Sequence, residues 1–397
     1  MLSVNAAVKK ILKAIQVLPP TELPLLESLG HVLAADILAP EPLPFFTNSA
    51  MDGYAVSYQD LHPLPRTLKV LEDIPAGKLP KEKICSGGCA RIMTGAPLPQ
   101  AADAVVPLEQ TDALAKGYVR ILAAVGKGQY VRSRGAEIYL GEKIFSQGHR
   151  LKPADLGLLA SLGISSVQVV SKPSVSLITS GSEIVEPTVL PRIGQIRNSN
   201  LVAVTAALTA LGIPIRNTQH VKDNLRSLQS ALLKCDSDVI ITCGGVSVGE
   251  YDLVKKVISE CGEIIFWKVA MKPGKPFLFG RLGRSLVFGL PGNPVSALVT
   301  FEVLVRPALL ALSGRKDLYP ATLKAVLTHS IKHHPDRQEY VRAHVRQTKR
   351  GSKIKSLAWQ GSGMLRSLSH ANAWIILRQR EKDCSAGSTV NYLPFPP

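Results

Sequence analysis

The sequence predicts a multidomain protein of α/β plus β structure, built around a doubly wound, mostly parallel α/β domain. Two observations predict that domain. Apolar strand-like runs alternate with helical patterns between residues 172 and 314, and three of the runs end in glycine-marked turns, after residues 174–179, 238–243 and 285–290. Such alternation favours a parallel sheet, and parallel sheets bind ligands beyond the carboxyl ends of their strands.

The three turns indicate what kind of ligand the sheet could bind. Glycine lets backbone N–H groups approach an anion closely, and a helix that begins there adds favourable partial charge. Ordinary strand-to-helix turns also favour glycine and serine, so one such turn decides nothing. Three in one α/β unit favour a phosphate-bearing ligand.

The part of the chain before this domain has several expected elements. Residues 8–17 form a periodic helix that ends at Pro19 and Pro20, and a second helix is expected over residues 21–29, with Gly30 as its stop. Residues 51–145 alternate in short runs without a convincing helix and predict a β-rich module. Its strands are expected at residues 67–71, 104–107, 118–122 and 143–145, and a helix follows at 153–162.

The α/β domain itself and the tail complete the pattern. Helices are expected at residues 201–211, 224–234, 252–261 and 294–312. Runs at 264–269, 277–280 and 285–288 lie so close together that they predict an added β-hairpin. The tail shows short strands at 323–327, 340–345, 353–357 and 373–377, which predict a small β-barrel or sheet module.

Composition excludes several classes of protein. The chain has 397 residues, a formal charge of +17 and only 5% aromatic residues, and its basic residues are scattered. A stacking platform for nucleic acid is therefore not supported. Its most apolar long run, 294–312, contains Glu302 and Arg306 and is expected to be a packed helix, not a membrane span. The six cysteines show no zinc spacing and suggest free thiols, so we expect a cytoplasmic protein.

Charged residues gather near the expected ligand edge. Lys268, Lys272 and Lys275 surround a turn that proline and glycine hold in shape, and lysine acts there as a point charge for oxyanions. The alternative is a solvated basic turn. Acidic residues also occur near this edge, and they could hold Mg²⁺ or simply cap helices. They are Glu183, Asp223, Glu250 and Asp252.

Taken together, these segments resemble one family, the MoeA molybdopterin molybdenumtransferases, which are related to the E domain of gephyrin. The resemblance covers nearly the whole chain in the same order. It rests on residues 48–55, 91–97, 134–135, 194–196, 244–252, 266–268, 272–276, 289–296 and 360–367.

The resemblance implies a homodimer of four-domain subunits whose cleft lies between the α/β domain of one subunit and the β module of the other. It implies a linker or dimerisation domain at 20–44 and 141–170, and a β-rich inserted module at 45–140. A molybdopterin-binding-like α/β domain at 1–19 and 171–315 precedes a C-terminal β-barrel-like domain at 316–397.

The implied activity is insertion of molybdenum from molybdate into adenylylated molybdopterin, with Mg²⁺ and with release of AMP. The implied partners are the adenylyltransferase that supplies the substrate and the enzymes that receive the cofactor; nucleic acid and membrane are not expected. The implied catalytic residues are Asp52, Thr94, Glu183, Asp223, Asp252, Lys268 and Lys272, with Glu183 and Asp252 on the metal. The implied substrate-binding residues are Gly245, Ser247, Gly249, Lys275, Pro291, Pro294, Ser296, Arg132, Glu137 and Ser362.

Three positions depart from the family pattern. Glu137 and Ser182 stand where the family usually has aspartate, and Arg197 stands where it favours tyrosine. Loss of a carboxylate at Ser182 would weaken cation binding. Two other interpretations stay open: a non-catalytic scaffold like the gephyrin E domain, and a basic nucleic-acid binder.

Overall fold

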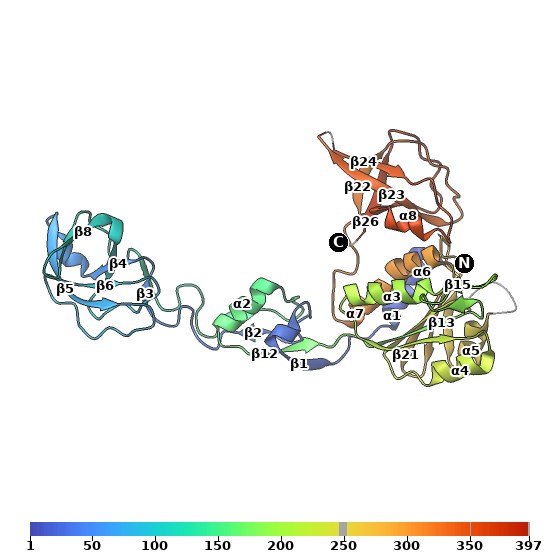
Figure 1. The fold of residues 1–397 in the computed structure, drawn as a ribbon, viewed down its shortest axis with the longest axis horizontal. Coiled ribbons are helices and arrows are strands. Elements are labelled where there is room, and N and C mark those ends of the chain that lie inside the picture. Colours follow the sequence, from blue (N-terminus) through green and yellow to red (C-terminus); the bar gives the residue numbers. More distant parts are fainter. Residues whose placement is uncertain (246–251, 350, 396–397) are drawn as a thin grey trace. The chain divides into compact units, whose positions relative to one another are not determined.

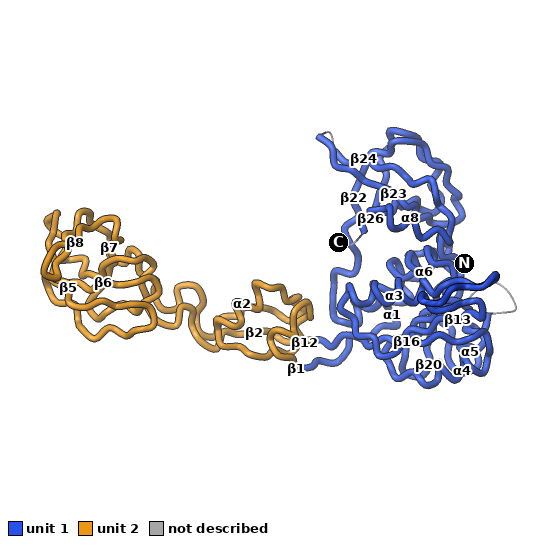
Figure 2. Tube along the Cα trace, in the orientation of Figure 1, with its two compact units in different colours: residues 1–21, 170–397 blue, residues 22–169 orange. Residues whose placement is uncertain are grey.

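The computed structural model describes residues 1–245, 252–349 and 351–395. Its residues group into two units, one formed by residues 1–21 and 170–397 and the other by residues 22–169 (Figure 2). We describe each unit by itself. The finer division into four domains stays a prediction.

The centre of the first unit is a six-stranded sheet with the strand order β16-β13-β17-β21-β20-β18 (Figure 1). Its first four strands are parallel. Strand β20 runs antiparallel to β21, and β18 runs antiparallel to β20. The predicted doubly wound domain and its added hairpin are therefore confirmed. In sheet order the strands span Ile215–Val221, Val175–Ser180, Val239–Cys243, Ser285–Leu290, Leu278–Leu282 and Glu263–Trp267.

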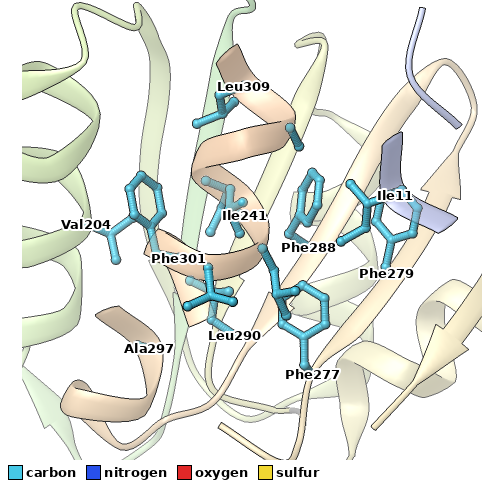
Figure 3. Close-up of a cluster of buried hydrophobic side chains, with 14 of the residues drawn as sticks. Ile11, Val204, Ile241, Phe277, Phe279, Phe288, Leu290, Ala297, Phe301 and Leu309 are labelled. Atoms are coloured by element: carbon cyan, nitrogen blue, oxygen red, sulfur yellow. The ribbon is translucent and has the colours of Figure 1, made fainter. Parts of the chain in front are cut away.

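Helices cover both faces of this sheet. Because neighbouring residues of a strand point to opposite faces, Ile241 packs in the cluster with α1, α3, α6 and α7, whereas Ile240 packs with α4 and α5. Figure 3 shows the first cluster, in which Phe301 and Leu309 lie over Ile241 and Leu290. The helices span Val4–Ala14 (α1), Ser199–Ala210 (α3), Leu225–Leu233 (α4), Leu253–Cys261 (α5), Pro294–Thr300 (α6) and Arg306–Leu312 (α7).

The predicted long helix over residues 294–312 is interrupted by a π-helical turn, Phe301–Val305, between α6 and α7. Pro307 has no N–H and cannot complete the regular α-helical pattern with Val303, which explains why the local turn widens just before it. Among the described residues this stretch is also the one candidate for a membrane span, and 78% of its most apolar window is buried inside the protein. It packs in the core of the first unit.

A closed barrel completes the first unit. Strands β23, β24, β22, β26 and β25 follow one another, and β25 pairs again with β23. The predicted tail module is therefore a barrel, and all four predicted strands are present. The strands span Gln338–Thr348, Gly351–Ser356, Leu323–Leu327, Thr389–Pro394 and Ala373–Leu377, with a short helix, α8, at Leu365–Ser369. A two-residue strand, β19 (Met271–Lys272), joins β23 in parallel register from the α/β domain.

The second unit contains a six-stranded sheet of order β7-β4-β6-β5-β9-β8, which confirms the β-rich module. These strands span Ala104–Pro107, Gly53–Val56, Gly88–Ile92, Arg66–Ile74, Tyr118–Ile121 and Thr111–Leu114. Short pairs accompany it: β3 (Asn48–Ser49) with β10 (Val131–Arg132), β2 (Ile37–Leu38) with β11 (Lys143–Phe145), and β1 (Pro20–Pro24) with β12 (Ser166–Val170). Helix α2 spans Pro153–Ser161.

The prediction of a helix over residues 21–29 is wrong. Residues up to Pro24 form strand β1, and only Leu25–Ser28 makes a 3₁₀ turn. Pro24 disfavours helical geometry at Leu23, so the residues before it stay extended and the short turn begins only at Leu25.

Candidate active site

The glycine-marked turns meet at the carboxyl edge of the sheet. Gly244 has a φ of +95°, and a Cβ there would lie 2.6 Å from the carbonyl oxygen of Ser180. A Cβ on Gly292 would lie 3.7 Å from the Cα of Gly244. The hydroxyl of Ser180 is buried and has no hydrogen-bond partner among the described residues. Gly245, with a φ of +67°, continues the second turn, and the predicted Ser247 and Gly249 lie outside the described residues.

Asp252 begins helix α5 at this edge. Its Oδ1 accepts the backbone N–H of Lys255 at 3.1 Å, which makes Asp252 the N-cap that the sequence suggested as one alternative. Its Oδ2 is buried and without a hydrogen-bond partner in the described part of the chain. Burial raises the pKa of the Asp252 carboxyl, and the neighbouring Lys255 and Lys268 partly offset that effect. One oxygen of Asp252 is thus structural and the other is available to a cation.

Lys268 lies just beyond β18, and its side chain and that of Lys255 contact the same aromatic ring. Their ammonium groups are 3.7 Å and 3.8 Å from the centre of the Trp267 ring, close enough for cation–π contact. Lys268 has a φ of +67°, an uncommon conformation for a long side chain, and its N–H donates to Phe277 O at 2.9 Å. Because β18 runs in the same direction as the parallel strands, Lys268 reaches the same edge as the glycine turns.

Asp223 and the turn after β13 are joined by two hydrogen bonds. The N–H of Ser182 donates to Asp223 Oδ2 at 3.2 Å, and the N–H of Asp223 donates to Ser182 Oγ at 3.2 Å. The serine at this departure from the family pattern therefore still ties the two turns together. Glu183 is exposed, and no three metal-binding side chains converge among the described residues.

A cavity of about 470 Å³ lies between the α/β domain and the barrel. It gathers five of the predicted site residues: Lys272, Lys275, Pro291, Ser296 and Ser362. The barrel contributes charged residues that sequence reasoning missed: Lys332, Arg337, Glu339 and Arg342. The cavity is therefore lined by five cationic residues, of which Arg342 is buried, and one carboxylate, and it suits an anionic ligand.

The turn that carries Lys272 and Lys275 is fixed on both sides. Lys272 belongs to β19 and pairs with Glu339 of β23, and its Nζ lies 3.3 Å from Glu339 Oε2. Gly274 has a φ of +107°, and a Cβ there would lie 2.5 Å from Thr300 Cγ2. Only glycine fits this position, which explains the glycine between the two lysines.

Ser362 comes from the barrel but bonds to the first turn of α6. Its carbonyl oxygen accepts the N–H of Val295 at 3.0 Å, and its hydroxyl accepts from Asn293 Nδ2 at 2.9 Å. Pro294 occupies the first position of that helix, where its missing N–H is not needed. The Ser362 loop and the third glycine turn are thus held as one surface.

Arg342 holds the same loop from inside the barrel. Its side chain is 1% exposed, and its Nη2 donates to the carbonyl oxygens of Trp359 and Gly361, each at 3.1 Å. Burial lowers the pKa of the Arg342 guanidinium to about 10, so it remains charged at neutral pH. A charged residue in the middle of the apolar run 340–345 was the sequence signal for this role.

The remaining predicted residues belong to the second unit. Asp52 Oδ1 accepts both the N–H of Thr94 at 2.6 Å and its hydroxyl at 2.7 Å. These two bonds lower the pKa of the Asp52 carboxyl. The exposed Arg132 lies on β10 opposite Asn48, and Glu137 is exposed with its N–H bonded to Leu43 O at 2.9 Å.

Three family models match successive parts of the chain. Residues 2–163 match the family model "MoeA N-terminal region (domain I and II)", residues 176–311 match "Probable molybdopterin binding domain", and residues 324–395 match "MoeA C-terminal region (domain IV)".

Similar full-length relatives carry one name. The molybdopterin molybdenumtransferase of Haemophilus influenzae is 37% identical, with 100% of this chain and 99% of the relative covered. The molybdopterin molybdenumtransferase 2 of Mycobacterium tuberculosis is 36% identical, with 98% of each covered. The crystal structure of a molybdopterin biosynthesis MoeA protein from Pyrococcus horikosii matches with a TM-score of 0.84 at 31% identity and covers all of both chains. These matches agree with the fold and with the predicted motifs, and the chain belongs to the MoeA family.

Proposed function

We propose that this protein is a molybdopterin molybdenumtransferase, which inserts molybdenum from molybdate into adenylylated molybdopterin and releases AMP. The observation that carries the proposal is the cavity in which Lys272 and Lys275, on one fixed turn, face the cationic wall of the barrel. Relatives with this name match over the full length of the chain.

Molybdate is the ligand that best suits the two lysines. It is a tetrahedral dianion, and ammonium groups bind such oxyanions as compact point charges. Lys275 belongs to the turn whose backbone shape Gly274 and β19 maintain, so the point from which its side chain enters the cavity is set before a ligand binds. We propose that Lys275 and Lys272 hold molybdate, and that Pro291, Ser296 and Ser362 shape the neighbouring wall.

The adenylylated pterin is proposed to bind at the glycine turns. Gly244 and Gly245 leave room for close backbone approach, and the buried Ser180 hydroxyl lies beside them. Lys268 is proposed to neutralise charge that develops on the phosphates when the phosphoanhydride breaks. Asp223 is proposed to order the turn after β13 through its pair of bonds with Ser182.

The donor set at this edge suits Mg²⁺. The buried, unpartnered Oδ2 of Asp252 is the kind of oxygen that Mg²⁺ prefers, and one or two carboxylates suffice for a cation that keeps several waters. We propose that Asp252, with Glu183, holds the cation. When bound, Mg²⁺ would supply charge neutralisation at the phosphates.

A homodimer is proposed to complete the site, with Asp52 and Thr94 of one subunit serving the α/β domain of the other. Large apolar side chains that are exposed in the second unit support an interface there: Leu26 is 82% exposed, Tyr139 69% and Leu140 68%. Arg132 and Glu137, which lie in the same unit, are proposed to contact substrate in that assembly.

Two further features support an enzyme in a reducing compartment. Asp52, Asp252, Lys272 and Lys275 are all retained, and a pure scaffold would not need them. All six cysteines are free thiols in the structure, which supports the proposed cytoplasmic location. The adenylyltransferase that supplies substrate and the enzymes that receive the cofactor are the proposed protein partners.

The experiment that tests this function measures the release of AMP. Purified protein is incubated with adenylylated molybdopterin, with and without molybdate and with and without Mg²⁺. We expect AMP only when both are present. Release without molybdate, or none with authentic substrate, would contradict the proposal.

A further inference from the structure

The cavity contains one buried carboxylate that the proposed chemistry does not use. Glu339 is 5% exposed, and its Oε2 lies 3.3 Å from Lys272 Nζ. Its other oxygen, Oε1, accepts the N–H of His334 at 3.0 Å and lies 3.3 Å from His333 Nδ1. A carboxylate enclosed in this way is held in one place.

His333 forms the wall behind this carboxylate. Its Nε2 lies 2.9 Å from the carbonyl oxygen of Arg378, and a carbonyl only accepts, so Nε2 carries a proton and donates it. The N–H of His333 donates to Asp383 Oδ1 at 2.8 Å. The bond from Nε2 holds the ring beside Glu339, and the His334 N–H holds Oε1, so that Oε2 is directed at Lys272.

A negative charge in this cavity opposes the binding of an anion. Glu339 is the one acidic residue among the described residues that line it, against the cations Lys272, Lys275, Lys332, Arg337 and Arg342. By Coulomb's law alone, the anion would bind more tightly without it. Its position therefore calls for a role that outweighs the repulsion.

Holding Lys272 is such a role. The ammonium group has three donors, so one bond to Glu339 leaves two for a ligand. A free lysine side chain loses much rotamer freedom when it binds, and a side chain that is already held loses less. The parallel register of Lys272 with Glu339 between β19 and β23 fixes the backbone of the pair as well.

We propose that Glu339 is a positioning residue, which holds the Lys272 ammonium at the cavity wall so that its free donors meet the bound oxyanion. The proposal rests on the proposed function. It adds that the barrel contributes to the affinity of the α/β domain for molybdate through this ion pair.

The test is a double-mutant cycle with molybdate-titrated AMP release as the readout. Glu339→Ala, Lys272→Ala and the double variant are compared with the wild type. Asp383→Ala is the matched control, because it removes a contact to His333 without touching the cavity. We expect Glu339→Ala to raise the molybdate concentration for half-maximal release about tenfold, the loss of one charge-assisted bond, with little change in the maximal rate.

The cycle separates positioning from folding. In the Lys272→Ala background, Glu339→Ala should no longer raise the molybdate requirement, and it should lower it somewhat because only the repulsion by the carboxylate is left, even if the melting temperature falls. Glu339→Gln, which keeps an acceptor for the ammonium, should lie between Glu339→Ala and the wild type. Asp383→Ala should leave the titration unchanged.

Other outcomes overturn the proposal. If Glu339→Ala tightens molybdate binding, the carboxylate acts mainly as a repulsive charge, and if it leaves binding unchanged, the carboxylate does not position Lys272. If Glu339→Ala raises the molybdate requirement by as much in the Lys272→Ala background, Glu339 acts through the stability of the fold. If the wild type itself releases no AMP, the proposed function fails first, so the two failures are distinguishable.

Discussion

The carbonyl oxygen of Ser362 accepts the backbone N–H of Val295 at 3.0 Å, and this bond joins a loop of the C-terminal barrel to the first turn of α6. The third glycine turn ends where that helix begins. The barrel and the α/β domain therefore build one cavity wall together. The stability of the Ser362 loop should then depend on what holds it inside the barrel.

Arg342→Leu tests that dependence. The change removes a charged donor from the carbonyl oxygens of Trp359 and Gly361. We expect the free energy of unfolding to fall by about 1.5–3 kcal/mol in urea titrations, because the loop loses two hydrogen bonds from a charged donor. Arg346→Leu on the same strand is the control, since Arg346 is exposed and should change stability by no more than about 0.5 kcal/mol. Equal effects of the two variants would show that Arg342 does not hold the loop.

Gly274→Ala tests the shape of the lysine turn. Alanine is strained at a φ of +107°, and its Cβ would lie 2.5 Å from Thr300 Cγ2. We expect a loss of about 1–3 kcal/mol in unfolding free energy and a weaker response to molybdate. Thr300→Ser removes the clashing methyl group but keeps the hydroxyl that bonds to Ser296 O. The double variant should recover part of the lost stability, and the part that is not recovered measures the backbone strain. A Gly274→Ala protein as stable as the wild type would contradict both the clash and the strain.

Thr94→Val tests the hydrogen bonds between Thr94 and Asp52 through the pKa of the Asp52 carboxyl. The backbone N–H and then the hydroxyl of Thr94 lower the pKa of Asp52 below its ordinary value of 3.8. Valine removes only the hydroxyl bond, so the pKa should rise part of the way toward 3.8, measured by NMR of labelled aspartate carboxyls. A carboxyl with a lowered pKa stabilises the folded state above 3.8 and loses that contribution as pH falls through the folded pKa. The stability difference between the two proteins should therefore shrink on acidification; an unchanged Asp52 titration would refute the role of the hydroxyl.

Much of the fold could be predicted because its signals are local. The expected strands at 373–377 and 104–107 have the observed bounds, since short apolar runs and the breakers that flank them fix them. The interruption of the helix over residues 294–312 was missed, although Pro307 stood in the sequence. The helix expected over residues 21–29 failed because Pro24 outweighs the apolar pattern around it.

The site was predictable only where short motifs carry it. The lysine turn and the glycine turns have their own local signatures, and the cavity gathers several of their residues. Glu339 lies more than sixty residues from Lys272 in the chain, and only the pairing of β19 with β23 brings them together. No pattern within either segment encodes that register, so the barrel side of the cavity could not be predicted.

Leu26→Asp tests the proposed homodimer. Leu26 lies in the proposed linker domain and is 82% exposed, and an aspartate at an apolar interface would bring an unpaired charge into it. We expect the wild type to have the mass of a dimer by light scattering at micromolar concentration, and the variant to be largely monomeric with little AMP release. Leu79→Asp is the control, because Leu79 is 79% exposed in the same unit but outside the proposed linker domain. A monomeric wild type with full activity would rule out a shared cleft.

Lys275→Ala and Asp252→Asn should fail in different ways. Lys275 is proposed to hold molybdate, so its loss should raise the molybdate concentration that is needed. Asp252 is proposed to hold the cation, so loss of its charge should slow AMP release even at saturating molybdate. Each change removes a charged contact, and about 2–4 kcal/mol of transition-state stabilisation is expected by analogy with a deleted oxyanion donor.

The choice of asparagine separates the two roles of Asp252. Asparagine caps a helix about as well as aspartate, so Asp252→Asn should keep the bond to the Lys255 N–H and the stability of α5. Asp252→Ala should lose about 1 kcal/mol more in unfolding free energy, because the cap is gone. Molybdate-titrated AMP release beside a urea titration for each variant checks both expectations. Identical kinetic profiles for Lys275→Ala and Asp252→Asn would refute the division of roles, and full activity in Asp252→Asn would leave Asp252 as a helix cap alone.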